Sequence, residues 1–166
     1  MIEKKLPLDD LPPALETVLG YWRGLGGAAL QCGWSDFHLD QLPPASLPTT
    51  LVVDVMPNAR DNVYRFWGTG LTWIHGVDLT SRTTAELPPP ELAEVVIASH
   101  ATTADDGVAS ASIFGFERFG GFDHMHSVLR LPLSNDGETV NQIVVVIDLT
   151  NEGRAEIKRQ QLESPG

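Results

Sequence analysis

Residues 62–87 change from strand chemistry to helix chemistry at one point, Gly68-Thr69-Gly70. The residues before this point, Val63 to Trp67, are β-branched, aromatic or long side chains of the kind that strands favour. The residues after it read as short helical segments that end before three prolines at 88–90. A strand that leads directly into short helices can form one wall of a small-molecule pocket. This order favours a sensory or binding module over a catalyst.

Strand-like segments lie on both sides of this point. Two precede the helical segments and three follow them, and a longer helix is expected from about Pro90 to Ala104, because proline suits a first helical turn. Two hairpins that flank a helical crossover predict an α+β fold, with a five-stranded antiparallel sheet and its helices on one face. The expected strands are Leu51–Met56, Val63–Trp67, Val108–Arg118, Phe122–Leu133 and Val140–Thr150.

An amphipathic helix is expected before the sheet, at about 13–25. Its apolar positions, Leu15, Val18, Leu19 and Trp22, recur with helical spacing along one face. That face must dock either on the second face of its own sheet or on a second subunit, and we expect a homodimer through this helix. The expected organisation is a helix and proline-rich linker at 1–49, a sheet domain at 50–150 and a polar tail at 151–166.

The charge balance argues against some partners. The chain has 22 acidic and 11 basic residues, with a formal net charge of -11, and such a surface repels phosphate backbones. We therefore expect no direct binding to nucleic acid or to an anionic membrane. No apolar stretch approaches the roughly 18 residues of a spanning helix, and the N-terminus lacks an apolar signal core. A cytoplasmic protein is expected.

Catalytic motifs are absent from the sequence, which contains no GxSxG, HExxH or GxxxxGK[ST] pattern. Cys32 is the single cysteine and lies in the linker, so flavin photochemistry that needs a well-placed cysteine is not expected. An enzyme alternative remains, in which Asp54, Asp78 and His100 form the acid/base set of a small cone-shaped isomerase or hydratase. Those folds place a long helix directly before the sheet, whereas this main helix interrupts the strands. We expect no catalytic site.

Four motifs in order resemble one known family. The chain is similar to a PAS domain, and in particular to the stand-alone proteobacterial PAS-like family once grouped as a domain of unknown function. The similarity runs from about residue 15 to residue 150, and one departure is Ser81, where the family more often has glycine. The motifs are Tyr21-Trp22-Arg23, Tyr64-Arg65-Phe66-Trp67-Gly68-Thr69, Gly76-Val77-Asp78-Leu79-Thr80 with Arg82, and Leu131-Pro132-Leu133-Ser134 with Asp136-Gly137.

This resemblance implies a five-stranded sheet that cups a cavity beneath its helices and binds a ligand or a protein partner. A single-domain sensor of this kind would act by changing its own association with a signalling protein. The resemblance names neither the small molecule nor the partner. The alternative is an adaptor module with a filled core, whose surface does the work.

Helix and strand faces supply candidate pocket residues. His100 shares the sheet-facing side of its helix with Val96, where it could contact a ligand, ligate a haem iron or be a satisfied core histidine; haem is the least favoured of these. His75 either contacts the pocket or lies on the surface. Ser127 and Leu129 are placed on the pocket face of their strand, opposite His124, His126 and Arg130. The candidate ligand-binding residues are Phe66, Trp73, Ile74, Val96, His100, Phe114, Ser127 and Leu129, with the cofactor unknown and no metal site expected.

Overall fold

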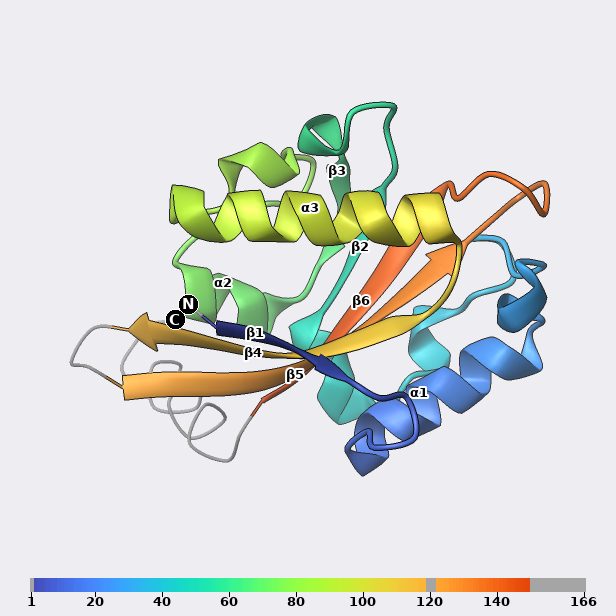
Figure 1. The fold of residues 1–166 in the computed structure, drawn as a ribbon, viewed down its shortest axis with the longest axis horizontal. Coiled ribbons are helices and arrows are strands. Elements are labelled where there is room, and N and C mark those ends of the chain that lie inside the picture. The colour runs from blue at the N-terminus through green and yellow to red at the C-terminus, as the bar shows by residue number, and fades with distance from the viewer. Residues whose placement is uncertain (1, 119–121, 150–166) are drawn as a thin grey trace.

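The computed structural model describes residues 2–118 and 122–149 (Figure 1). The predicted polar tail, the turn at 119–121 and Thr150 lie outside the described residues. Short 3-10 turns join the main elements, among them η3 (Pro44–Thr49) in the linker. The main elements are β1 (Ile2–Leu6), α1 (Pro13–Gly24), β2 (Thr50–Asp54), β3 (Val63–Trp67), α2 (Thr69–His75), α3 (Pro90–Asp106), β4 (Ser110–Arg118), β5 (Phe122–Leu133) and β6 (Gln142–Leu149).

Within the described residues, six strands form one sheet in the order β1-β4-β5-β6-β2-β3. Every neighbouring pair is antiparallel. The predicted α+β class and antiparallel sheet are therefore confirmed. The helix that interrupts the strands, α3, follows the hairpin of β2 and β3 and precedes the three-strand meander of β4, β5 and β6, as the sequence predicted.

The predicted count of five strands was wrong, because β1 adds a sixth at the edge of the sheet. It pairs with β4, and Glu3 lies opposite Phe114 in the register. Three of its five residues are charged, Glu3, Lys4 and Lys5. Charged edge strands are common because they discourage pairing with other chains, but this composition hides the strand from a search for apolar alternation.

The sheet is covered on both faces. α1 contacts β5 and β6 from one side, and α3 contacts the same two strands from the other. We name the two resulting clusters the α1-side core, which includes Trp22, Val52, Leu129 and Val144, and the α3-side core. The α3-side core includes Leu51, Tyr64, Leu92, Phe114 and Val145.

The apolar face of α1 is buried against its own sheet. The sequence left open whether this face docks on the sheet or on a second subunit, and the structure shows that it docks on the sheet. Leu15 and Val18 are fully buried, and Trp22 is 2% exposed. The Trp22 indole N–H also donates to the Pro132 carbonyl oxygen at 3.0 Å. The predicted use of this face for a homodimer is therefore corrected, because these side chains already fill the core.

β6 is the central strand that the sequence predicted. Val144 and Val146 belong to the α1-side core, and Ile143 and Val145 belong to the α3-side core. Because successive strand residues point to opposite faces, a continuous apolar run is buried on both sides here.

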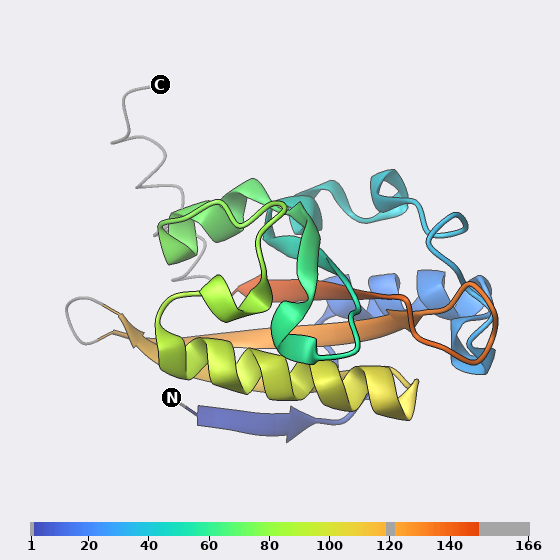
Figure 2. The same cartoon turned by 90° about the horizontal axis from the view of Figure 1, so that it is seen from above.

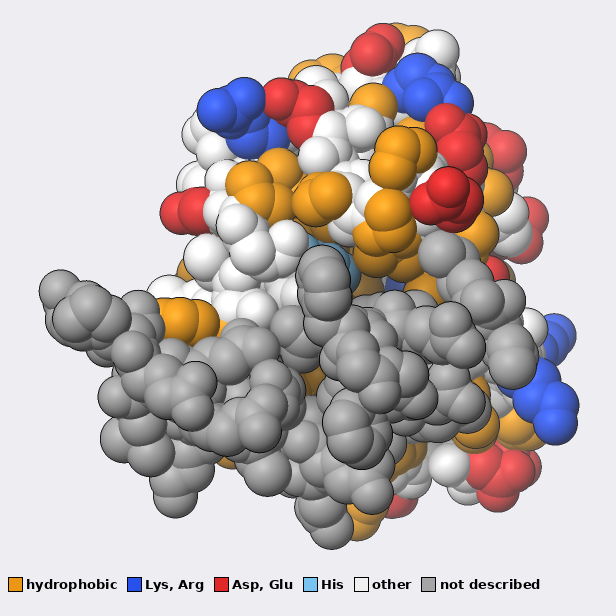
Figure 3. Space-filling model, turned by 90° about the vertical axis from the view of Figure 1, so that its left-hand side faces the viewer, with side chains coloured by type: hydrophobic (Ala, Val, Ile, Leu, Met, Phe, Trp, Pro, Cys, Tyr) orange, Lys and Arg blue, Asp and Glu red, His pale blue; other side chains and the backbone are white. Residues whose placement is uncertain are grey.

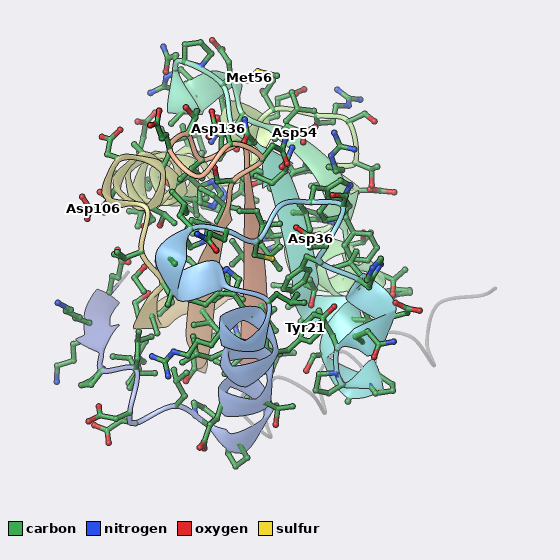
Figure 4. The ribbon with its side chains drawn as sticks, turned by 90° about the vertical axis from the view of Figure 1, so that its right-hand side faces the viewer. Tyr21, Asp36, Asp54, Met56, Asp106 and Asp136 are labelled. Atoms are coloured by element: carbon green, nitrogen blue, oxygen red, sulfur yellow. The ribbon has the colours of Figure 1, made fainter. Side chains whose placement is uncertain are left out.

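The glycines of the opening motif allow the linker to cross the β3–α2 junction. A Cβ at Gly68 would overlap the carbonyl oxygens of Leu47 and Pro48, and one at Gly70 would crowd Pro48. The linker itself is fixed from α1, where the Tyr21 ring packs edge-on against Phe37 and its hydroxyl accepts a hydrogen bond from the His38 N–H at 3.0 Å. Figure 4 shows Tyr21 on α1 in front of the sheet, with the linker that carries Asp36 beside it.

A bulge in the β2–β3 pair sets which β3 side chains face α3. Val52 pairs with Phe66, but the next residue, Val53, pairs with Tyr64, so Arg65 is the extra residue. A bulge reverses the usual alternation of faces. Tyr64 and Trp67 consequently both enter the α3-side core, while Phe66 packs against the α1-side core.

Candidate functional site

A cavity of about 80 Å³ lies between the sheet and its covering helices α2 and α3. Most of its wall is apolar, with side chains from β2, β3, β4, β5 and β6 as well as from the helices. Figure 3 views the molecule from the left-hand side of Figure 1, where α2 lies, and hydrophobic side chains gather around a histidine there. The polar and ionisable side chains in the wall are Tyr64, Trp67, His75, Ser99, His100, His126 and Arg130.

His100 enters the cavity wall from α3 and is held in its neutral form. Its side chain is 2% exposed. Burial lowers the pKa of His100 to about 3, and the nearby positive charge of Arg130 lowers it further. Its Nδ1 atom is buried and has no hydrogen-bond partner among the described residues. Buried polar atoms are rarely left unpaired, so this nitrogen points to a missing partner.

Arg130 enters the same wall from β5. Its Nη2 donates to the Ser112 hydroxyl at 3.0 Å and to Glu3 Oε1 at 3.3 Å. Burial lowers the pKa of Arg130 and Glu3 raises it, but an arginine remains charged throughout the physiological range. The cavity therefore has one fixed positive charge in its wall.

Aromatic rings form the side of the cavity nearest α2. Tyr64 and Trp67 meet edge to face, with ring centroids 4.9 Å apart, and the His75 ring lies 5.7 Å from Trp67. The Trp67 indole N–H donates to the Thr72 hydroxyl at 3.2 Å. Burial raises the pKa of Tyr64, which keeps its hydroxyl neutral. Flat rings in fixed positions suit a small planar or apolar ligand.

Four of the eight predicted ligand-binding residues line this cavity, namely Ile74, Val96, His100 and Phe114. His75, for which a surface position was the alternative, also lines it. Trp73 is on α2 but is not part of the lining.

The other three predicted residues lie on the opposite face of the sheet. Leu129 belongs to the α1-side core and Phe66 packs against that core. Ser127 shares the strand face of Leu129. Phe66 faces away from the cavity because the bulge at Arg65 puts it on the opposite face from Tyr64. For the β5 pair, the face richest in leucine was assigned to the pocket, whereas it packs under α1.

The sequence interpretation missed His126, Val128 and Arg130 as lining residues. They lie on the β5 face that was assigned away from the pocket. A mixed polar and apolar face opposite a uniformly leucine-rich face was the available signal, since a uniform face suits a dry core and a mixed one suits a binding wall. Deciding which face of β5 lines the cavity required knowing that α1 covers the other face of the same sheet.

The residues of the enzyme alternative are not brought together. Asp54 lies at the end of β2, where Arg65 Nε donates to it at 2.7 Å. Asp78 is in a turn and accepts hydrogen bonds from the Thr80 amide and hydroxyl, which lower its pKa. Neither carboxylate lines the cavity that contains His100. The structure thus offers no support for that acid/base set.

Cys32 lies on the far side of the sheet from the cavity. It is fully buried in the α1-side core. Burial raises the pKa of its thiol to about 11, with a further contribution from Asp36. The single cysteine of the chain is therefore a protonated core residue and cannot reach a ligand in the cavity.

The size of the cavity limits its ligand. Pockets for drug-sized molecules measure roughly 300–1,000 Å³, and this one measures about 80 Å³. Neither a haem nor a flavin fits that space without rearrangement of the helices. Within the described residues there is also no group of three His, Cys, Asp or Glu side chains arranged to hold a metal ion. None of the helices in the described part is both long and apolar enough to cross a membrane.

No protein-family model and no curated protein matches the sequence. Among solved structures, the chain resembles VqmA from Vibrio cholerae. A VqmA dimer structure aligns with a TM-score of 0.51 and 13% identity over 64% of this chain and 48% of VqmA. A VqmA–ligand–DNA complex aligns with a TM-score of 0.51 and 13% identity over 75% of this chain and 58% of that one. The aligned part thus spans about half of VqmA.

LOV domains, which are PAS-type, are also among the structural neighbours. The dark structure of the blue-light photoreceptor Aureochrome1 LOV aligns with 17% identity over 78% of this chain and 96% of that one, with a TM-score of 0.48. At these identities the shared property is the fold alone. The chain has an antiparallel α+β fold, and the VqmA structures align with it at a TM-score of 0.51.

Proposed function

We propose that this protein is a PAS-type sensory or regulatory module that binds a small ligand in the cavity between α3 and the sheet. The observation that carries the proposal is His100, a neutral, buried histidine in the cavity wall whose Nδ1 has no partner among the described residues. A ligand that hydrogen-bonds to this atom would satisfy it. The four motifs that resemble the stand-alone proteobacterial PAS-like family support the same proposal.

The ligand we propose is smaller than haem or flavin. LOV structures are described as blue-light photoreceptors and one is described with a flavin analogue, but here Cys32 is buried on the other face of the sheet. VqmA is described bound to DPO and in a ligand–DNA complex. We infer a comparable use of this fold, with a compact ligand against the aromatic wall.

The output we propose is a change in association with a signalling protein. The apolar face of α1 is already in the core, so a partner or a second copy must use another surface. An adaptor that binds no ligand is the second candidate, and the small volume of the cavity favours it. The two candidates differ in whether the cavity is occupied in the purified protein.

The experiment is a native mass spectrum with an absorbance scan of the freshly purified protein, followed by a thermal-shift screen of small ring compounds. We expect extra mass or a stabilising ring compound for the wild-type protein and loss of both in His100→Leu. The exposed His38, replaced in the same way, is the matched control and should bind like wild type. A bare protein that no compound stabilises would instead support the adaptor.

A further inference from the structure

The fixed positive charge in the cavity wall is only partly neutralised. The Arg130 side chain is 9% exposed, and its ion-pair partner, Glu3, is 36% exposed and reaches it with one oxygen at 3.3 Å. A planar guanidinium has five N–H donors, and its favoured partner is a carboxylate that engages two of them. Here Nη2 is the nitrogen that donates to Ser112 and to Glu3, and Glu3 offers it a single oxygen rather than a two-oxygen pairing.

Building on the proposed sensory function, we propose that the cavity selects a small monocarboxylate with an apolar or aromatic body. The carboxylate pairs with Arg130, and the body packs against the rings of Tyr64, Trp67 and Phe114 in the cavity wall. Neutral His100 supplies a further hydrogen bond to the same ligand. Arg130 is thus the specificity-determining residue of the site.

The charge of Arg130 favours an anionic ligand over a cationic or neutral one. A cationic ligand would bring a second positive charge against a buried guanidinium, which is costly in a low-dielectric site. A neutral ligand of the same shape would leave the Arg130 donors as they are. An anion adds a charge-assisted pair to a largely buried guanidinium, and such bonds are about twice as strong as neutral ones. The cavity volume of about 80 Å³ limits the ligand to about one ring.

Glu3 is the internal competitor for this ligand. It belongs to β1, the edge strand that lies beside α3 (Figure 2), and it also accepts a hydrogen bond from the Ser99 hydroxyl at 3.5 Å. A ligand carboxylate that takes up Arg130 weakens the pair with Glu3. Occupation of the cavity is therefore linked to how firmly this edge strand is held.

The test uses two probes of equal shape, benzoate and benzamide, and measures their dissociation constants by calorimetry or NMR titration. We expect wild-type protein to bind benzoate at least about tenfold more tightly than benzamide, the effect of one charge-assisted hydrogen bond. Glu3→Gln removes the competitor and should tighten benzoate binding severalfold without changing benzamide binding.

The matched control is Glu94→Gln, because it changes the net charge equally and breaks an exposed ion pair with Arg60 outside the cavity. It should leave both affinities unchanged. Glu3 and Glu94 are both at the surface, so both variants are expected to fold. A third variant, Arg130→Lys, keeps the positive charge but loses the planar guanidinium that can bind both oxygens of a carboxylate. In Arg130→Lys we expect the preference for benzoate to fall.

The outcomes separate this proposal from the sensory function on which it rests. Equal or tighter binding of benzamide in wild-type protein overturns the preference for an anion and leaves a ligand-binding cavity in place. An equal effect of Glu3→Gln and Glu94→Gln overturns the role of Glu3 as competitor. If neither probe binds the wild-type protein or Glu3→Gln, the carboxylate proposal fails, and the native mass spectrum still decides whether another ligand occupies the cavity.

Discussion

His100 makes the stability of this protein depend on pH in a predictable direction. Its pKa is about 3 in the folded chain and 6.5 in the reference state, so between these values the unfolded chain binds more protons than the folded one. Stability must then fall as pH falls below 6.5, by at most about 1.4 kcal/mol per pH unit from this residue. We expect chemical denaturation from pH 6.5 to 5 to show this slope in wild type and not in His100→Gln.

The control for this prediction is His38→Gln, which removes an exposed histidine that makes no contact with the cavity. Its stability should follow the wild-type dependence on pH. The difference between the wild-type and His100→Gln curves isolates the contribution of His100. A wild-type curve no steeper than that of His100→Gln would show that His100 is accessible to protons in the native state.

Ser81 occupies a backbone position that glycine would occupy at lower energetic cost. Its φ is 65°, in the left-handed region that costs a side chain about 1–2 kcal/mol. Ser81→Gly should therefore stabilise the fold by about 0.5–1 kcal/mol after the added freedom of the unfolded glycine is subtracted. At about 2–4 °C per kcal/mol for a chain of this size, calorimetry should resolve the rise in Tm. Ser35→Gly, in an exposed turn without positive φ, should not raise it.

At the scale of elements, the β3–α2 junction depends on close approach of the linker. An alanine at position 68 places a methyl group against the carbonyl oxygens of Leu47 and Pro48, and backbone atoms cannot move aside cheaply. We expect Gly68→Ala to destabilise the protein by about 1–3 kcal/mol, the usual cost of overpacking, measured by urea denaturation.

Replacing Gly20 with alanine is the matched control, and it is expected to change stability in the opposite direction. Gly20 lies in α1, is exposed, and has nothing within 4 Å of an added Cβ. Gly20→Ala should stabilise by about 0.5–1 kcal/mol through helix propensity alone. Equal effects of the two alanines would mean that the linker does not press on the junction.

The sequence predicts those elements whose ends are marked by residues close by in the chain. The β3 run ends at Gly68 as predicted, and α3 begins at Pro90, because turn and cap residues mark these points. The edge strand β1 depends on pairing with the distant strand β4, and the bulge at Arg65 depends on how β2 and β3 pair across their hairpin. No local pattern announces them, and the misplacement of Phe66 follows directly from the bulge.

At the scale of the whole molecule, predicting the cavity lining required a decision about which face of β5 points toward α3. β5 presents Leu129 to one helix and Val128 to another, and both faces are buried. The sequence alone could not say whether α1 covers its own sheet or a partner, so it could not assign the faces of β5. Val96 and His100 line the cavity because α3 has one apolar side to offer the sheet, whereas Trp73 on the short helix α2 does not line it.

This two-sided burial predicts a graded pattern of amide hydrogen exchange. Amides of β6 lie in the centre of the sheet beneath both α1 and α3, so they should exchange only through global unfolding, with a strong dependence on denaturant. β1 is an edge strand whose Glu3, Lys4 and Lys5 are exposed, so its amides should exchange through local opening that denaturant hardly accelerates.

Native-state exchange followed by NMR or mass spectrometry measures both quantities for the two strands. A β1 that opens by itself can respond to the Glu3–Arg130 pair without loss of the core, which is what a link between cavity and edge strand requires. If β1 instead shows the protection and the denaturant dependence of β6, the two strands unfold together. A ligand could then change the stability of the whole sheet but could not release its edge.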